Sequence, residues 1–142
     1  MQLTTFSDYS MRLMMMAAAH PERLVTIEET ANAYGISRAH LMKVANLLTR
    51  QGFLEAVRGR TGGLRLARPP EEIRLGALVR ATESDFAIVE CFASGNKCRI
   101  TGRCRLKGVL GEALEAFLAV LDRYTLADLA LRPEDFGVVR AA

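Results

Sequence analysis

Apolar residues recur at helical spacing along the first part of the chain, and polar residues mark where each helical segment begins. Residues 5–19 carry Leu13 and Met16 on one helical face. Thr5 and Asp8 have the spacing of a capping box, in which two side chains satisfy free amide groups at the start of a helix. The pattern predicts a first helix over residues 5–19.

Two shorter helical segments follow, and a polar turn separates them. Thr26 and Glu29 form a second capping box ahead of one helix. Gly35 is a natural helix stop, and Ser37 is a natural N-cap for a further helix that ends near Arg50. Two helices joined by a short glycine-containing turn are typical of a helix-turn-helix motif.

Strand-like segments replace the helical spacing after Gly52. Residues 53–57 and 64–67 predict two short strands, and the glycine-rich segment 58–63 joins them. A β-hairpin that follows a helix-turn-helix has the place of a wing. These elements predict a mainly α fold with a small β-hairpin, built as a winged helix-turn-helix domain.

One long amphipathic helix is predicted farther along, from about Cys104 to Tyr124. Its apolar stripe consists of Leu106, Val109, Leu110, Ala113, Leu114, Phe117, Leu121 and Tyr124. A helix of this length spans roughly 30 Å, and pairing it with its copy would bury the stripe symmetrically. We therefore expect a long C-terminal dimerisation helix and a homodimer.

Positive charge is concentrated within the predicted winged helix. The chain has a formal net charge of +3, but residues 38–80 contain nine Lys and Arg side chains against three Glu. A local basic excess is what a DNA-binding face requires, because contacts with phosphates dominate affinity. The side chains expected to contact double-stranded DNA are Arg38, His40 and Lys43 on the second helix of the motif and Arg58, Arg60 and Arg65 on the hairpin.

The three cysteines, Cys91, Cys98 and Cys104, lie in a segment without sustained periodicity. We expect no signal peptide, and the apolar run Met11–Ala19 is too short to span a bilayer, so we expect a cytoplasmic protein that makes no membrane contact. Thiols stay reduced in that compartment. Clustered thiolates are the usual ligands of iron–sulfur clusters and also suit zinc, although the absence of a CxxC pair argues against a zinc ribbon.

A fourth ligand is not fixed by the cysteine spacing. Neither histidine lies near the cysteines in the sequence, whereas Glu90 and Asp8 each offer a carboxylate. Cys104 stands where the long helix begins, and the positive end of the helix dipole would stabilise its thiolate form.

Several segments together resemble the bacterial winged-helix iron–sulfur regulators, the family that includes NsrR and IscR, and most closely its NsrR-like members. These segments are residues 1–9, 57–66, 104–107 and 124–129, and the resemblance extends to about Leu131. It implies a transcriptional repressor that senses nitric oxide and releases an inverted-repeat operator when its cluster is nitrosylated. It also implies that the metal ligands are the three cysteines together with Asp8 of the partner subunit.

The resemblance bears on cluster type as well. IscR-like members carry a histidine three residues after the last cysteine, and this chain has Lys107 there, so a [4Fe–4S] cluster is favoured over [2Fe–2S]. The expected division is a DNA-binding domain in residues 1–83, a cluster-binding loop in 84–104, and a dimerisation helix with a C-terminal segment in 105–142. The tail after Pro133 is expected to be peripheral.

Other functions stay open at this point. The same scaffold suits an iron- or redox-sensing regulator, IscR-like or thiol-based, and the long helix suits a module that mainly binds another protein. A small thiol or iron–sulfur oxidoreductase is a third class. The sequence has no nucleotide-binding glycine motif and no supported Cys–His pair, so it is not expected to be an enzyme.

Overall fold

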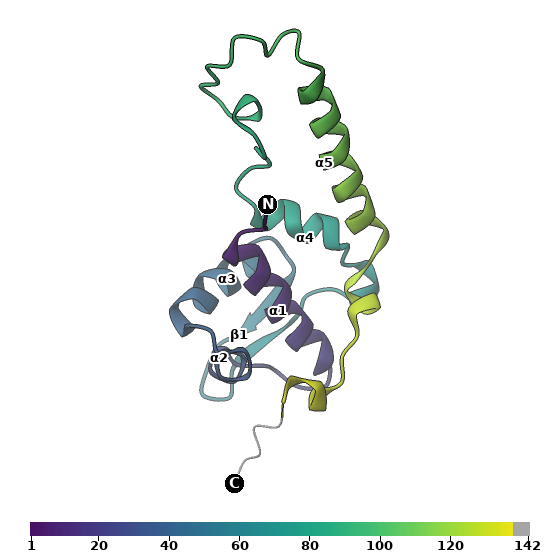
Figure 1. Ribbon diagram of the computed structural model, residues 1–142. Helices are drawn as coiled ribbons and strands as arrows, with labels where there is room; N and C mark the ends of the chain where they lie inside the picture. The colour runs from purple at the N-terminus through teal and green to yellow at the C-terminus, as the bar shows by residue number, and fades with distance from the viewer. Residues whose placement is uncertain (138–142) are drawn as a thin grey trace.

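The chain folds into a helical body from which one long arm projects (Figure 1). The computed structural model describes residues 1–137, and residues 138–142 of the predicted C-terminal segment lie outside this range. The body contains α1 (Thr5–Ala19), α2 (Ile27–Tyr34), α3 (Arg38–Arg50), β1 (Leu54–Val57), β2 (Gly63–Leu66) and α4 (Leu75–Thr82). The arm is formed by the cysteine loop, residues 84–104, and by α5 (Arg105–Arg123). Short 3₁₀ turns are Pro70–Glu72, Glu90–Phe92, Leu126–Leu129 and Pro133–Phe136.

The core of the body lies where α1 packs against α3 and α4. Leu13, Leu41 and Leu78, one from each helix, are all fully buried. Leu48 joins them from the next-but-one turn of α3, so helical spacing brings one apolar face of each helix to the centre. Within residues 1–137, the chain has no helix long and apolar enough to cross a membrane.

The boundaries of the helix-turn-helix follow its capping residues. The Thr26 hydroxyl accepts from the Glu29 amide while the Glu29 carboxylate accepts from the Thr26 amide, which confirms the predicted capping box. Gly35 ends α2 with φ of 65°, a conformation that glycine adopts without steric cost. Ser37 caps α3 by accepting from the His40 amide. These contacts confirm the predicted turn between the two helices.

The start of α1 differs from the prediction. The N-cap is Thr4, whose hydroxyl accepts from the Ser7 amide, so the predicted capping box of Thr5 and Asp8 is wrong. Thr4 is favoured because its amide and hydroxyl also both donate to a carboxylate oxygen of Glu83, at 2.8 and 2.9 Å. That partner lies 79 residues away, beyond the reach of a local sequence pattern.

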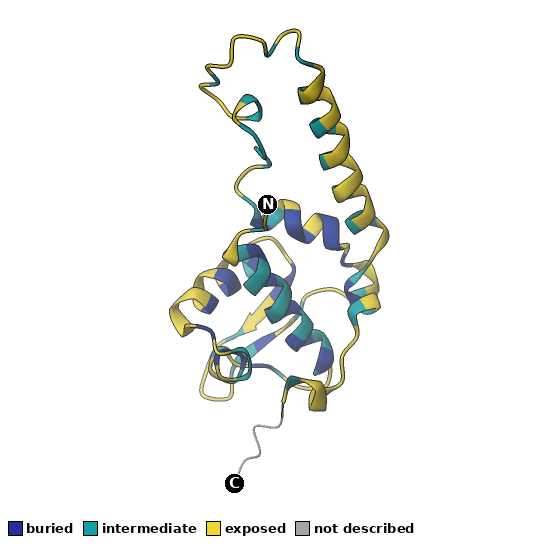
Figure 2. Ribbon diagram, in the orientation of Figure 1, coloured by how far each residue is buried: buried dark blue, intermediate teal, exposed yellow. Residues whose placement is uncertain are grey.

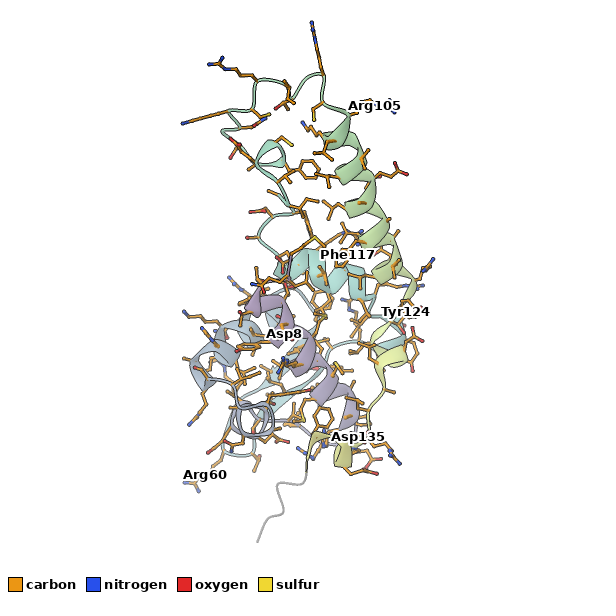
Figure 3. The ribbon with its side chains drawn as sticks, in the orientation of Figure 1. Asp8, Arg60, Arg105, Phe117, Tyr124 and Asp135 are labelled. Atoms are coloured by element: carbon orange, nitrogen blue, oxygen red, sulfur yellow. The ribbon has the colours of Figure 1, made fainter. Side chains whose placement is uncertain are left out.

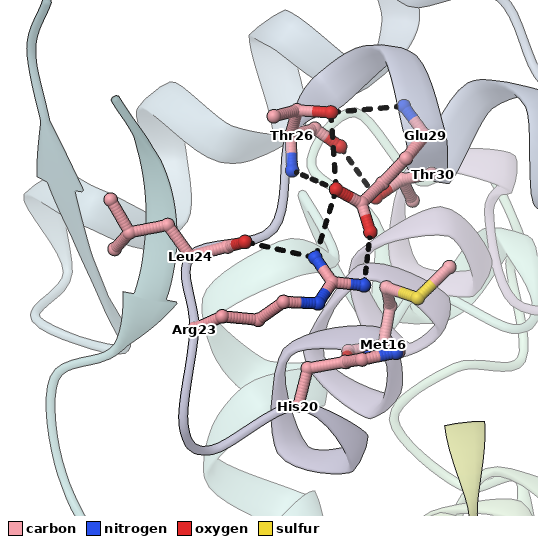
Figure 4. A network of polar contacts seen from close by, with 7 residues as sticks. All are labelled: Met16, His20, Arg23, Leu24, Thr26, Glu29 and Thr30. Carbon is pink, nitrogen blue, oxygen red and sulfur yellow. Dashed lines mark hydrogen bonds and ion pairs between the residues drawn. The ribbon is translucent and has the colours of Figure 1, made fainter. Parts of the chain in front are cut away.

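A polar network fixes the turn between α1 and α2 (Figure 4). Arg23 forms an ion pair of 2.8 Å with Glu29, the residue that closes the α2 capping box. Arg23 also donates to the carbonyl of Leu24 at 3.0 Å. Burial raises the pKa of Glu29, but the bonds from Arg23 and Thr26 outweigh it and the pKa is lowered. The turn therefore presents α2 and α3 in a fixed orientation to α1.

The hairpin is held to the body through backbone contacts. β1 and β2 pair antiparallel with Leu54 opposite Leu66. Val25 and Leu64 exchange two backbone hydrogen bonds of 2.9 and 2.7 Å. A Cβ on Gly63 would lie 2.7 Å from the Val25 carbonyl oxygen, so only glycine allows this close approach. The predicted fold class, mainly α with a small β-hairpin in a winged helix-turn-helix, is confirmed.

The arm projects away from the body, and none of the 19 residues of α5 is buried (Figure 2). The predicted apolar stripe divides into two. Leu110, Leu114 and Leu121 are half-buried. The second stripe, called here the outer stripe, is exposed and consists of Leu106, Val109, Ala113, Phe117, Val120 and Tyr124. Val120 had not been assigned to the stripe from the sequence.

The chain returns to the body after α5. Phe136 packs edge-to-face against Tyr34, with 5.7 Å between ring centroids, and lies 6.1 Å from the ring of His20. Phe136 is the one partly buried side chain of residues 133–137, and it anchors this otherwise exposed, peripheral segment at α1 and α2.

Replacing a core residue of α3 will show how far the helix-turn-helix depends on this packing. We expect Leu41→Ala to lower the free energy of unfolding by about 2–5 kcal/mol, since it leaves a cavity at a fully buried site. Its neighbour Met42 is 55% exposed, and Met42→Ala is expected to cost about 0.5 kcal/mol or less. Urea denaturation measures both, and equal losses would contradict the assignment of the buried face.

Candidate nucleic-acid interface and cysteine loop

The exposed face of α3 carries the three residues predicted for base contacts. Arg38, His40 and Lys43 are all exposed, because the opposite face of the helix is fixed in the core. The ring of His40 lies 5.9 Å from that of Tyr9, so a residue of α1 helps to position it. Asn46 shares the exposed face and was missed. Its distance of three residues from Lys43 is the signal that identifies it.

The tip of the wing presents two further cations. Arg58 and Arg60 are exposed on the turn between the strands, and Figure 3 shows Arg60 at the end of the body opposite the arm. Arg68 lies over the ring of Phe53, at 5.0 Å from its centroid, which fixes its stem beside the hairpin. The wing is thus placed to contact DNA backbone next to the groove that α3 would enter.

Arg65, the third predicted wing contact, is already paired. It lies opposite Glu55 in the strand register and donates two hydrogen bonds to that carboxylate, both of 3.1 Å. The hydrogen bond lowers the pKa of Glu55 and raises the pKa of Arg65. Both side chains are 54% exposed. A phosphate approaching Arg65 must therefore compete with a carboxylate of the same hairpin.

All three cysteines are free thiols on the arm. Cys98 is exposed, while Cys91 and Cys104 are partly exposed. In the described part of the chain, residues 1–137, no three His, Cys, Asp or Glu side chains come together as a metal site. Within this single chain, the three thiols are therefore not gathered into a metal site.

Hydrogen bonds shape the cysteine loop locally. The Glu90 carboxylate accepts from the amide of Lys97 at 3.1 Å and so closes the segment between Cys91 and Cys98. The side-chain oxygen of Asn96 accepts from the Cys98 amide at 2.9 Å. Glu90, one of the two carboxylates considered as a ligand, therefore has a structural partner in the loop.

The surroundings of the thiols suit anionic sulfur ligands. Between positions 91 and 111 the chain has five Lys and Arg residues and no Asp or Glu. Cys91 lines an open hollow of about 530 Å³ between the loop and α5, together with Phe86, Phe92, Lys107 and one acid, Asp85. The three thiols are a donor set that fits an iron–sulfur cluster, and the nearby cations and apolar side chains are surroundings that suit its charge.

Asp8 belongs to the body rather than to the arm. Figure 3 shows it on α1, whereas Arg105, next to Cys104, lies near the far end of the arm. Its two carboxylate oxygens each accept a hydrogen bond of 2.9 Å from Arg12. The Arg12 guanidinium lies 5.9 Å from the ring centroid of Tyr9 and 5.6 Å from that of Tyr34. Burial raises the pKa of Tyr34 to about 12, so it stays neutral as the partner of this cation.

A helix-turn-helix with an exposed basic face and a hairpin wing defines a winged-helix DNA-binding protein. The profile of the Rrf2 family, described as iron-dependent transcriptional regulators, matches residues 3–132, and the chain belongs to this family. It is 53% identical over 137 residues to the HTH-type transcriptional regulator NsrR of Bacillus subtilis (strain 168), covering 95% of this chain and 94% of that protein. It is 50% identical over 131 residues to NsrR of Geobacillus kaustophilus (strain HTA426), covering 91% and 89%.

Solved structures agree with this assignment. IscR from T. potens superimposes with a TM-score of 0.73 at 28% identity, over 91% of this chain and 85% of that chain. CymR of Staphylococcus aureus in its oxidised form gives a TM-score of 0.73 at 26% identity, over 92% and 96%. The resemblance to NsrR-like regulators is confirmed. The relatives are named as transcriptional regulators, and this confirms the prediction that the chain is not an enzyme.

The pairing of Arg65 leads to a test of the wing. We expect Glu55→Gln to release Arg65 and to tighten binding to double-stranded DNA by about two- to fivefold at low salt, with a smaller gain as salt rises. Fluorescence anisotropy across a salt series measures this effect.

Glu71 supplies a matched control for that test. It is exposed on the 3₁₀ turn after the hairpin and forms no ion pair with other side chains of residues 1–137. Glu71→Gln makes the same change in net charge without releasing Arg65. If both variants gain equally, the effect comes from net charge and the role assigned to the Glu55–Arg65 pair is wrong.

Proposed function

We propose that this transcriptional regulator is a homodimeric repressor that holds an iron–sulfur cluster, senses nitric oxide and then releases an inverted-repeat operator. One observation carries the proposal. Three free thiols lie on an arm whose residues 91–111 contain cations and no acids, in a chain 53% identical to a regulator named NsrR. The alternative is an iron- or redox-sensing regulator on the same scaffold.

The proposed ligands are Cys91, Cys98 and Cys104 together with the partner subunit's Asp8. When bound, the cluster would supply iron centres that react with nitric oxide. Lys107 lines the hollow beside Cys91 and takes the position where IscR-like members carry a histidine. A lysine with its charge is a poor metal ligand, which supports a [4Fe–4S] cluster over a [2Fe–2S] cluster.

Dimerisation is supported by the outer stripe of α5. Its members recur at intervals of three and four residues, so they form one continuous face. Val109 is 58% and Leu106 is 60% exposed, and an exposed apolar row of this length calls for a partner surface. A two-fold dimer presents two α3 helices in inverted orientation, which is the arrangement that an inverted-repeat operator matches.

The proposed division of labour follows the body and the arm. Residues 1–83 would bind DNA, residues 84–104 would hold the cluster, and the segment from 105 would form the dimer. A buried polar contact within residues 1–83 lies just before the loop begins. Ser7 of α1 and Thr82 of α4 share a buried hydrogen bond of 2.7 Å.

Contacts along α1 support communication between the cysteine loop and α3. Glu83 accepts from Thr4 at the point where the loop begins. Burial raises the pKa of Glu83, but the hydrogen bonds from Ser7 and Thr4 outweigh it, so the pKa is lowered and the carboxylate stays charged. Asp8 and Tyr9 follow on the same helix, and Tyr9 contacts His40. A change at Asp8 therefore has a short path to a side chain of the proposed DNA face.

The alternative sensor is favoured by one observation, the exposure of Cys98. An accessible thiol is open to oxidation, and a structural relative, CymR of Staphylococcus aureus, was solved in an oxidised form. Under this function, oxidation of bare thiols would change operator affinity, and nitric oxide would not.

The first test purifies the protein anaerobically, counts iron and sulfide, and titrates nitric oxide while operator binding is followed. We expect four irons and four sulfides per chain, and a loss of operator affinity by about 100-fold or more, towards the non-specific level. Cys98→Ala is expected to lose the cluster and to bind the operator as weakly as the nitric-oxide-treated protein does. Ser94→Ala, on the same loop, is expected to keep the cluster and its operator affinity. Unchanged operator binding by Cys98→Ala would refute cluster dependence. Indifference to nitric oxide with sensitivity to oxidants would favour the alternative.

Mixed dimers test whether Asp8 acts across the dimer. A dimer of one Asp8→Ala chain and one Cys98→Ala chain keeps a complete site only if the carboxylate and the cysteines come from different chains. We expect this mixed dimer to lose its cluster to a chelator at the wild-type rate, and an Asp8→Ala homodimer to lose it about tenfold faster or more. A mixed dimer as labile as the Asp8→Ala homodimer would show that Asp8 does not complete the partner's site.

A further inference from the structure

The arm is joined to the body at the C-terminal end of α5, and one carboxylate organises that joint. Asp122, near the end of α5, forms a two-pronged ion pair with Arg80 of α4, and one of its hydrogen bonds measures 2.8 Å. Arg74, which precedes α4, donates to the backbone carbonyl of Asp122 at 3.3 Å. Two cations from one short segment of the body thus hold a single residue of the arm.

Gly76 makes room for this carboxylate. A Cβ built on Gly76 would lie 1.8 Å from Oδ1 of Asp122 and 2.8 Å from Nη1 of Arg80. Gly76 is buried within α4, where glycine is otherwise unfavourable relative to alanine. The glycine therefore has a packing role, because it lets α5 approach α4 closely enough for the ion pair to form.

Backbone hydrogen bonds on either side of Asp122 also hold α5 to the body at this joint. The Leu75 amide donates to the Tyr124 carbonyl at 3.0 Å, and the Leu126 amide donates to the Ile73 carbonyl at 2.8 Å. Leu126 and Ile73 are buried, so the chain leaving α5 is fixed in the core. Bonds on both sides of Asp122 leave little freedom in the angle between α5 and α4.

A small change in the angle between α5 and α4 would move the far end of α5 by a large distance. α5 has 19 residues, which gives a length of about 28 Å. A change of about 10° in its direction would displace its far end by about 5 Å, which exceeds the rise of about 3.4 Å for one base pair. The outer stripe lies along this helix, so the joint fixes where the body stands relative to a second copy bound there.

We propose that Gly76, Arg80 and Asp122 form a joint that sets the distance and rotation between the two DNA-binding bodies of the dimer, and so selects the spacing of operator half-sites. The inference rests on the proposed function in requiring a dimer that reads an inverted repeat. Each inserted base pair shifts one half-site by about 3.4 Å and rotates it by about a tenth of a turn. A rigid joint rejects such operators, and a loosened joint tolerates them.

Two variants loosen the joint by different means. Asp122→Asn keeps the size of the side chain but removes the charge that holds Arg80. Gly76→Ala keeps every charge but places a methyl group where the carboxylate lies. Glu115→Gln is the matched control, because Glu115 is an exposed carboxylate on α5 that makes no ion pair with any side chain in residues 1–137.

The experiment uses the purified cluster-loaded protein and an inverted repeat selected by the wild type from randomised duplexes. Binding is measured to this duplex and to versions with one or two base pairs added to or removed from its centre. We expect the wild type and Glu115→Gln to prefer the selected spacing by about tenfold or more over a one-base-pair change. We expect Asp122→Asn to reduce that preference to about threefold or less while binding non-specific DNA as before.

Controls separate positioning from folding. Melting temperature, dimer mass and the visible spectrum are measured for each variant, and Asp122→Asn suffices if Gly76→Ala fails to fold. If Asp122→Asn is folded and dimeric but keeps the full spacing preference, the proposed role of the joint is wrong. The same conclusion follows if the wild type binds its inverted repeat without any spacing preference. A wild type that selects no inverted repeat at all overturns the proposed function itself.

Discussion

The exposed apolar face of α5 is the constraint on which the other parts of the molecule depend. The helix buries none of its residues within its own chain, and full burial of one large apolar side chain is worth about 1.5–3 kcal/mol. A stripe of six residues therefore carries a strong drive to pair. Pairing through that stripe would place each cysteine loop opposite a second chain, and it would fix two winged helices on one scaffold.

The body is a rigidly packed unit, whereas the arm extends away from it. Leu13 and Leu41 lock α1 to α3 in the core, while Val25 holds the wing through backbone hydrogen bonds. The α3 side chains that face outward are consequently presented by a packed unit. Under the proposed function, the arm would change DNA affinity by moving this whole unit as well as through the contact of Tyr9 with His40. The Ser7–Thr82 bond lies inside this unit, just before the arm begins at residue 84.

Local signals were enough to predict the elements, and contacts between distant residues decided the rest. The cap at Ser37 and the stop at Gly35 were readable because both act within four residues. The cap of α1 was misplaced because Thr4 and Thr5 are adjacent and look alike locally. The partner that accepts from Thr4, Glu83, becomes its neighbour only after α4 has packed against α1.

The electrostatics of the candidate site also depend on contacts that local sequence patterns do not reveal. A net charge of +3 hides nine cations and three acids in residues 38–80, five cations and no acid in 91–111, and five cations and thirteen acids in the remainder. The first excess lies in the part proposed to bind DNA, and the second lies around the thiols, where it would offset the charge of sulfur ligands. The sequence located both excesses, but it did not reveal that Glu55 already engages Arg65. We therefore expect affinity for DNA to depend on which cations can leave their carboxylate partners, a property that net charge alone does not measure.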